Sequence, residues 1–192
     1  KFGAERIRDL VISLRNFSHL DEADVKPVNI HEIIDSSILI LHTCIKEKSD
    51  RSQIEIVRNY GNLPQVICQI SQIHQVFMNL LINGIDALET MRDKQQEYNR
   101  KPTITISTEV TDSETVKIKI HDNGIGINSQ TLSKIFDPFF TTKAVGAGTG
   151  LGLSISYSIV VEKHGGNLSC VSEVGKGTEL IIEIPIKPRT DN

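Results

Sequence analysis

Several features are scarce in this sequence of 192 residues, and each scarcity excludes a class of protein. No apolar run approaches the roughly 20 residues that span a bilayer, and no cleavable signal peptide opens the chain. The formal net charge of −3 argues against a nucleic-acid-binding protein, which usually presents a basic face. The three cysteines, Cys44, Cys68 and Cys170, form no CxxC pair, so we expect free buried thiols in a reducing compartment. These absences predict a cytoplasmic globular protein, and any membrane anchor would lie outside this sequence.

The composition is ordinary for such a protein, with 39% hydrophobic and 23% charged residues, and the length suffices for one domain with an appendage. The chain begins at Lys1 in the middle of a helical pattern, so we expect a fragment of a longer protein. Apolar residues recur every three or four positions in residues 1–20, which predicts an amphipathic helix. The apolar stripe of this helix could pack on its own domain or on a helix outside the fragment, and we favour the second because a polar linker follows at residues 21–24. The stripe comprises Ile7, Leu10, Val11, Leu14 and Phe17.

The rest of the chain alternates between helical and strand patterns. Ser71 is expected to cap a long helix that carries the apolar residues Val76, Phe77, Leu80 and Leu81 on its buried face. The polar residues 92–101 are interpreted as a solvated loop. Strands are predicted at residues 28–30, 53–60, 65–68, 103–110, 115–120, 167–172 and 178–185, and further helices at residues 31–47 and 151–163. This order predicts an α+β fold, a two-layer α/β sandwich in which about three helices cover a mixed, mostly antiparallel sheet.

The first candidate binding segment reads Asn-Leu-Leu-Ile-Asn-Gly-Ile-Asp-Ala and occupies residues 79–87. Asn79 and Asn83 lie one helical turn apart, so both amides project from one face of the long helix, near Asp86. Amide oxygens suit a hard cation such as Mg²⁺, which keeps several waters and shares the phosphates of a substrate. The simpler alternative is a polar helix edge, and we favour the metal because these side chains gather opposite the buried face.

The second segment, residues 122–126, places a carboxylate at the end of a strand, immediately before two glycines. Asp122 can accept a hydrogen bond from an exocyclic amine, which would select adenine over guanine. Gly124 and Gly126 let the backbone turn close to a ligand. In isolation the same residues would be a tight turn capped by aspartate, and the neighbouring segments favour the adenine interpretation.

The third segment, residues 146–153, is a glycine run that opens a helix at about Leu151. It lacks the Lys-Ser/Thr ending of a P-loop and the preceding buried strand of a dinucleotide-binding turn. We interpret residues 127–149 as a lid that leads into a helix N-terminus, whose free amides attract phosphate. Lys143 in this lid is expected to reach the terminal phosphate, with a solvated lysine as the alternative.

In this order the segments resemble the motifs of the catalytic ATP-binding domain of sensor histidine kinases, in the wider GHKL group of gyrase, MutL and heat-shock chaperone ATPases. Residues 79–87 resemble the N box, residues 122–126 the G1 box, residues 136–140 the F box and residues 146–152 the G2 box. A last motif at residues 175–178 is similar to one that places Thr178 near adenine. The resemblance covers about residues 28–186 and departs at Gly84, where alanine is commoner in the family.

The resemblance implies a protein-histidine kinase with the family's α/β sandwich fold and with ATP and Mg²⁺ as cofactors. We hypothesise that Asn83 and Asn79 hold Mg²⁺ and that Asn79 and Lys143 act in phosphoryl transfer. Residues 1–24 are similar to the C-terminal part of the second dimerisation and phosphoacceptor helix plus a linker, residues 25–188 to the catalytic domain, and residues 189–192 form a tail. The residues expected around the nucleotide are Asn79, Asn83, Asp86, Asp122, Gly124, Gly126, Ile127, Phe136, Phe140, Lys143, Gly146, Gly148, Thr149, Gly150, Leu151, Gly152, Leu153 and Thr178.

The family's acceptor motif, His-Glu followed by proline one turn later, is missing upstream of these segments. His31-Glu32 matches superficially, but the next four residues contain no proline, so we interpret His31 as structural. The acceptor histidine is therefore expected on a hairpin outside this fragment. The resemblance also implies a homodimer in the full-length protein and a response regulator receiver domain as its partner, with no nucleic acid.

Three other functions share these motifs. An ATPase of the gyrase or chaperone type carries a glutamate base where Asn79 stands, and Asn79 cannot take a proton from water. A serine kinase of the anti-sigma type is disfavoured by the amphipathic helix at residues 1–20. A regulatory module that binds nucleotide without catalysis ranks last, because the motifs look intact.

Overall fold

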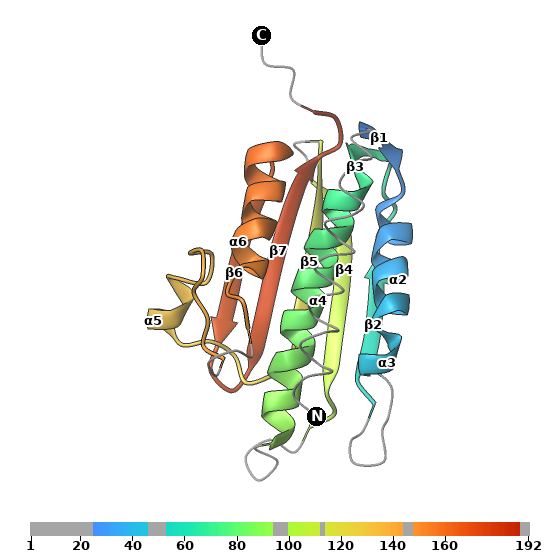
Figure 1. Cartoon of the computed structure of the whole chain (residues 1–192). Helices are drawn as coiled ribbons and strands as arrows, with labels where there is room; N and C mark the ends of the chain where they lie inside the picture. The colour runs from blue at the N-terminus through green and yellow to red at the C-terminus, as the bar shows by residue number, and fades with distance from the viewer. Residues whose placement is uncertain (1–24, 46–52, 94–99, 112–113, 144–147, 189–192) are drawn as a thin grey trace.

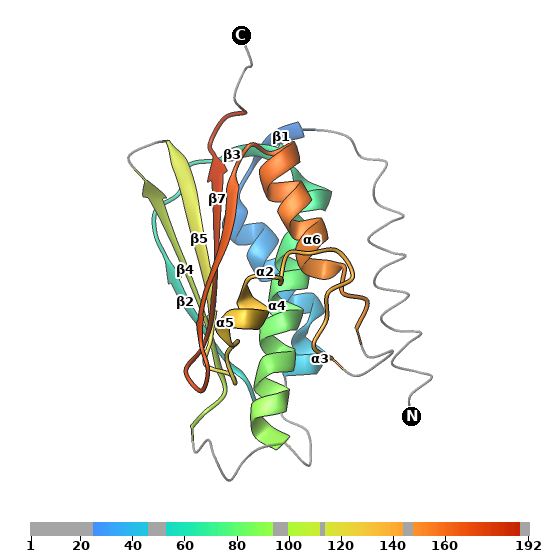
Figure 2. The same ribbon diagram turned by 90° about the vertical axis from the view of Figure 1, so that its left-hand side faces the viewer.

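The computed structural model describes residues 25–45, 53–93, 100–111, 114–143 and 148–188, so the helix expected at residues 1–20, its linker and the tail lie outside the described residues. The described residues form two layers, in which α2, α4 and α6 cover one face of a five-stranded sheet (Figures 1 and 2). The predicted α+β sandwich is confirmed. No helix in this part of the chain is long and apolar enough to cross a membrane.

The elements follow the predicted order closely. The strands are β1 (Val25–Val28), β2 (Glu55–Tyr60), β3 (Val66–Gln69), β4 (Thr103–Thr111), β5 (Thr115–Asp122), β6 (Asn167–Glu173) and β7 (Gly177–Pro185). The helices are α2 (Ile30–Ile40), α3 (His42–Ile45), α4 (Ile70–Asp93), α5 (Ser129–Leu132) and α6 (Gly152–Tyr157), which continues as the π-helix η1 (Ser158–Lys163).

The main sheet has the strand order β2-β4-β5-β7-β6, and β2 pairs in parallel with β4 while the other pairs are antiparallel. Alternate residues of the central strands are buried because successive side chains point to opposite faces. The uncovered face carries ion pairs, with Lys117 Nζ 2.9 Å from Glu183 Oε1. A separate two-stranded sheet pairs β1 with β3 in antiparallel fashion.

The 24-residue helix α4 lies between α2 and α6 over the sheet (Figure 1). Its inward face carries Phe77, Leu80 and Leu88, all fully buried, and hydrophobic burial of this size is the main stabilising contribution of such a core. Asn79 and Asn83 lie on a half-buried side of the same helix. One helix therefore supplies both the core of the domain and part of the candidate site.

Three local predictions differ from the structure. Ser71 does not cap α4, because the helix begins at Ile70 and includes Ser71 in its first turn. Residues 92–101 are not wholly a solvated loop, since α4 continues to Asp93 and Arg100 is half-buried. The helix expected at residues 31–47 is interrupted at Leu41, where α2 gives way to the single turn α3.

Two histidines, His31 and His164, have packing roles. The ring of His31 stacks on Tyr60 with centroids 4.2 Å apart, and its Nε2 lies 2.9 Å from Thr108 Oγ1. His164 Nδ1 lies 2.7 Å from Ile159 O, and burial lowers the pKa of both imidazoles. These contacts give His31 the structural role that the sequence predicted. All three cysteines are free, with Cys68 buried and the other two half-buried.

Candidate functional site

Asp122 is the last residue of β5, and its side chain is buried between the two layers. The carboxylate accepts a hydrogen bond from Gly124 N at 2.8 Å and another from the backbone N–H of Thr178. Burial nevertheless raises the pKa of Asp122 to about 6, because the charged form loses water. A buried carboxylate with acceptor capacity to spare suits an amine donor on a ligand.

The turn after Asp122 is attached to the end of the β6–β7 hairpin. Ser172 Oγ accepts from Ile127 N at 2.8 Å and donates to Gly177 O at 2.9 Å. Thr178 lies directly opposite Asp122 in the β5–β7 pairing, and its Oγ1 is 2.9 Å from Ser172 Oγ. The structure thus brings together Asp122 and Thr178, which the sequence analysis expected near adenine, and Ile127, which it expected around the nucleotide.

Two glycines at this end occupy positions that a side chain would block. Gly126 has a φ of +70°, and a Cβ there would lie 2.0 Å from Glu173 O. Gly177 has a φ of +122°, and a Cβ there would lie 1.9 Å from Asp122 O. Both glycines therefore allow the β5 end and the β6–β7 turn to approach one another.

Asn79 links the candidate metal-binding face of α4 to the start of α6. Its Nδ2 donates to Gly152 O at 3.0 Å and to Ser156 Oγ at 3.2 Å, while its carbonyl oxygen takes no part in these two bonds. Asn83 lies one turn further along α4 and is half-buried. Among the described residues, no three or more His, Cys, Asp or Glu gather closely enough to hold a metal ion. Two amide oxygens with one nearby carboxylate fit Mg²⁺ that takes its remaining ligands from water and phosphate.

The lid contacts the same face of α4. Lys143 Nζ forms an ion pair with Asp86 Oδ2, so two predicted site residues are in direct contact. Phe139 has a φ of +65°, and its backbone lies against Gly150, where a Cβ would come within 2.4 Å of Phe139 C. The backbone of the aromatic motif at residues 136–140 therefore lies against the glycine run at Gly150.

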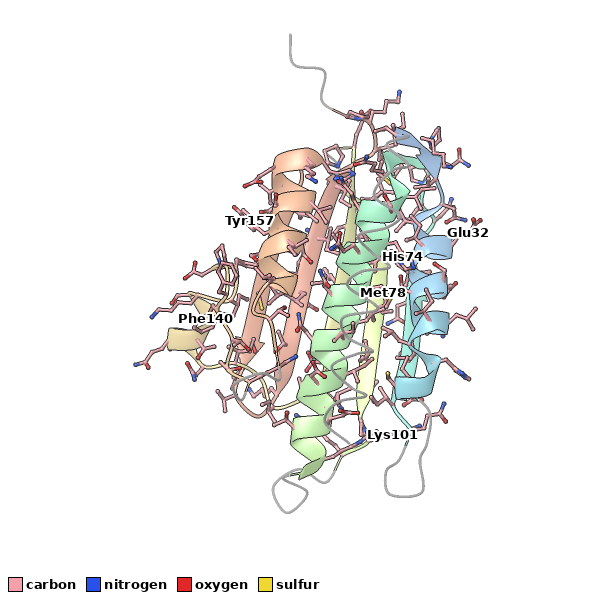
Figure 3. All side chains as sticks on the ribbon, viewed as in Figure 1. Glu32, His74, Met78, Lys101, Phe140 and Tyr157 are labelled. Carbon is pink, nitrogen blue, oxygen red and sulfur yellow. The ribbon has the colours of Figure 1, made fainter. Side chains whose placement is uncertain are left out.

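The remaining predicted residues lie along the lid and the first turn of α6. Phe136 packs on the core with its ring centroid 5.5 Å from that of Tyr157, and Leu153 also packs on the core. Phe140 is half-buried on the lid (Figure 3). Leu151 precedes α6 without a side-chain cap, and its N–H lies 3.4 Å from Thr149 Oγ1. Gly148 is close to Lys143 and Thr141, whereas Gly146 lies outside the described residues.

Sequence reasoning missed Arg100, Ser156 and Ser172. One terminal nitrogen of Arg100 donates to Gly124 O at 2.9 Å and to Gly175 O at 2.8 Å. Arg100 stands in a run of polar residues just before β4, and nothing in a single sequence separates it from its neighbours. The serines interrupt apolar patterns on α6 and β6, which is a weak signal of a polar contact with another element.

Comparison with known proteins identifies the family. The family model described as histidine kinase-, DNA gyrase B- and HSP90-like ATPase matches residues 68–188. Sensor kinase CckA of Brucella abortus is 32% identical over 190 residues, which are 96% of this chain and 20% of that protein. Sensor histidine kinase ZraS of Escherichia coli is 32% identical over 166 residues, 84% of this chain and 33% of that protein. The chain thus spans a fifth to a third of the length of these curated relatives.

Solved structures show the same architecture. The catalytic domain of histidine kinase ThkA in a nucleotide-free form has a TM-score of 0.69 and 30% identity, covering 86% of this chain and 99% of that one. The structure of ThkA in complex with response regulator protein TrrA has a TM-score of 0.68 and 24% identity, covering 98% of this chain and 50% of that one. The chain belongs to the histidine kinase-, DNA gyrase B- and HSP90-like ATPases, and within that family it is a catalytic domain of the sensor histidine kinase type.

Proposed function

We propose that this domain binds Mg²⁺-ATP and transfers its γ-phosphate to a histidine on a hairpin of the parent protein. The observation that carries the proposal is the buried carboxylate of Asp122, which lies between two glycine turns and opposite Thr178. This arrangement gives an adenine amine an acceptor shielded from water. Because the chain spans a fifth to a third of its curated relatives, the acceptor is assigned to a segment outside the domain.

The adenine end selects the base and the α4 face receives the phosphates. Asp122 accepts from the exocyclic amine, and the hydrogen bonds from Gly124 and Thr178 keep its carboxylate in place. Asn79 and Asn83 offer carbonyl oxygens for Mg²⁺, which when bound neutralises phosphate charge in the reaction. Since Nδ2 of Asn79 is held by Gly152 and Ser156, its oxygen is oriented before any ligand binds.

Lys143 supplies positive charge near the phosphates. In the structure it is paired with Asp86, so the two partners must separate, or rearrange, when Lys143 contacts a γ-phosphate. Phosphoryl transfer depends mainly on positioning and on neutralising charge. A lid lysine that exchanges a carboxylate for a phosphate would meet both needs.

The parent protein is proposed to dimerise through its hairpin and to pass the phosphate to a receiver domain. The support comes from the relatives, which are named sensor kinases, and from ThkA, which is described in complex with response regulator protein TrrA. Hydrolysis of the gyrase type is not favoured, because the amide of Asn79 donates hydrogen bonds and cannot act as a base. Steady-state ATP turnover by the isolated domain would contradict this assignment.

Calorimetric titration with a non-hydrolysable ATP analogue tests the site. We expect binding that Mg²⁺ strengthens and that GTP does not reproduce. Asp122→Asn should weaken it by about one to two decades, because a hydrogen bond to a charged group contributes about 1.5–3 kcal/mol. Asp35→Asn is the matched control, since Asp35 is exposed and pairs with Arg58 on a different part of the domain. Equal affinity in the wild type and the Asp122 variant would refute the adenine assignment.

A further inference from the structure

Arg100 connects two segments that are far apart in sequence. It precedes β4 next to Lys101, which Figure 3 labels at the end of that strand. Its guanidinium donates both to Gly124 O, in the turn after β5, and to Gly175 O, in the β6–β7 turn. Both bonds come from one terminal nitrogen of the planar guanidinium, whose N–H directions are fixed, whereas the ammonium of a lysine is more flexible. The side chain therefore fixes the separation of the two turns.

The Gly124 turn is held from both sides. The Gly124 N–H donates to Asp122 Oδ1 at 2.8 Å, while its carbonyl oxygen accepts from Arg100 at 2.9 Å. The backbone adds a direct bond between the turns, from Gly175 N to Ile125 O at 2.7 Å. Displacing the guanidinium would thus release the carbonyl side of the turn whose N–H orients the Asp122 carboxylate.

The charge of Arg100 also acts on Asp122. Burial raises the pKa of Asp122, and the positive charge of Arg100 opposes that effect. Among the described residues, the thiol of Cys170 on β6 also interacts with Asp122, and its pKa is raised to about 12 by burial and by Asp122 itself. Cys170 therefore stays neutral near neutral pH, whereas the positive charge of Arg100 favours the ionised carboxylate.

We propose that Arg100 is a positioning residue of the nucleotide site, which acts by tying the turn after Asp122 to the β6–β7 turn and by holding the carboxylate ready to accept from adenine. The proposal rests on the function proposed above, in which Asp122 binds the base. It assigns a role in nucleotide affinity to a residue outside the five motif segments of the sequence analysis. Arg100 makes no contact with the reacting phosphate in this role.

The test is the pH dependence of ATP-analogue binding, measured by calorimetry between pH 5.5 and 8.5. In the wild type, affinity falls as pH drops through the pKa of Asp122, because a protonated carboxyl no longer offers a charged acceptor. Arg100→Gln should weaken binding at pH 7 by roughly five- to thirtyfold, the effect of losing about one to two kcal/mol, and should move the midpoint to higher pH. Arg100→Lys keeps the charge without the planar guanidinium, so it should retain the wild-type midpoint and lose part of the affinity.

Lys101→Gln is the matched control, because Lys101 is an exposed neighbouring cation that pairs with Glu55. It should leave both the affinity and the midpoint unchanged. Unchanged binding by Arg100→Gln, or an equal loss at every pH without a shifted midpoint, would overturn the proposal. A second readout does not need the nucleotide: carboxyl NMR of the nucleotide-free protein should show a higher Asp122 pKa in Arg100→Gln. If the wild type does not bind ATP but this shift is seen, the proposed function fails while the assignment of Arg100 to Asp122 stands.

Discussion

Replacing Gly84 with alanine should stabilise this domain. Gly84 lies in the interior of α4, where glycine costs up to about 1 kcal/mol relative to alanine. A Cβ at this position would lie 3.4 Å from Ile104 Cδ1 and 3.5 Å from Asp122 Cβ, which is ordinary van der Waals contact. The added methyl would also be buried, which favours folding by up to about 0.8 kcal/mol for a group of this size. Minor adjustment of Ile104 offsets part of this gain, so we expect a net stabilisation of about 1 kcal/mol.

Thermal and urea unfolding of the variant measure this change. For a domain of this size, about 1 kcal/mol corresponds to a rise in Tm of roughly 2–4 °C, with an unchanged m-value. Destabilisation by Gly84→Ala would mean that α4 lies closer to β4 than the structure shows, and would refute the reasoning.

Two other glycines make the comparison sharper. At Gly124 a Cβ would lie 2.9 Å from both Ala87 C and Ala87 Cβ, so alanine should destabilise the domain. At Gly177 the φ of +122° and the 1.9 Å approach to Asp122 O exclude a side chain, so alanine should be the most damaging of the three. The free energy of unfolding should therefore be highest for Gly84→Ala. It should decrease in the order wild type, Gly124→Ala and Gly177→Ala.

The remaining predictions concern charge and hydrogen bonding at the site. The pKa of Asp122 in the folded protein is about 6, above its ordinary value of 3.8. The buried carboxyl therefore contributes its full share to the free energy of unfolding below pH 4, and this share is lost as the pH rises through 6. Without nucleotide, Asp122→Asn should therefore have a higher free energy of unfolding than the wild type at pH 8, by up to about 3 kcal/mol. At pH 4 the two proteins should not differ in this way, and an equal difference at both pH values would contradict the prediction. Ser172→Ala should cost about 1–3 kcal/mol in urea unfolding, because Ile127 N loses its acceptor, whereas Ser169→Ala on the same strand should cost less. Lys143→Ala should change stability by less than about 1 kcal/mol, since its ion pair is exposed, yet should slow phosphoryl transfer to the parent's hairpin; an unchanged rate would remove Lys143 from the mechanism.

The elements that could be predicted are those whose apolar residues recur at a regular spacing. β5 alternates half-buried and buried residues along its length, as does β4 through Thr108, and α4 repeats its apolar residues at helical spacing. These patterns reflect burial against one neighbouring layer, which a single sequence records directly. The resemblance to the family's motifs likewise predicted that Asp122 and Thr178 belong to one site, and the β5–β7 register places them opposite one another.

The features that could not be predicted depend on contacts between distant segments. Ser71 resembles a helix cap, yet β3 leads directly into α4 at Ile70. Arg100 looks like any cation in a polar run, and its role depends on two carbonyls that lie 24 and 75 residues further along the chain. The π-helix η1 continues α6 through Ser158–Lys163, where the periodic pattern indicates an ordinary helix. In each case the deciding partner comes from tertiary structure.

The place of β7 in the sheet has a consequence for the order of folding. β7 is the last strand of the described chain, yet it lies between β5 and β6, and it begins with Gly177 and Thr178 beside Asp122. A nascent chain that has not yet released residues 177–185 lacks the strand that separates β5 from β6, so it has no wall on that side of the carboxylate. Strand pairings between distant segments also form late, because their loop-closure entropy is large. Nucleotide binding should therefore appear in one step, after translation has passed β7, and ATP would act as a ligand of the completed sheet and not of any earlier intermediate.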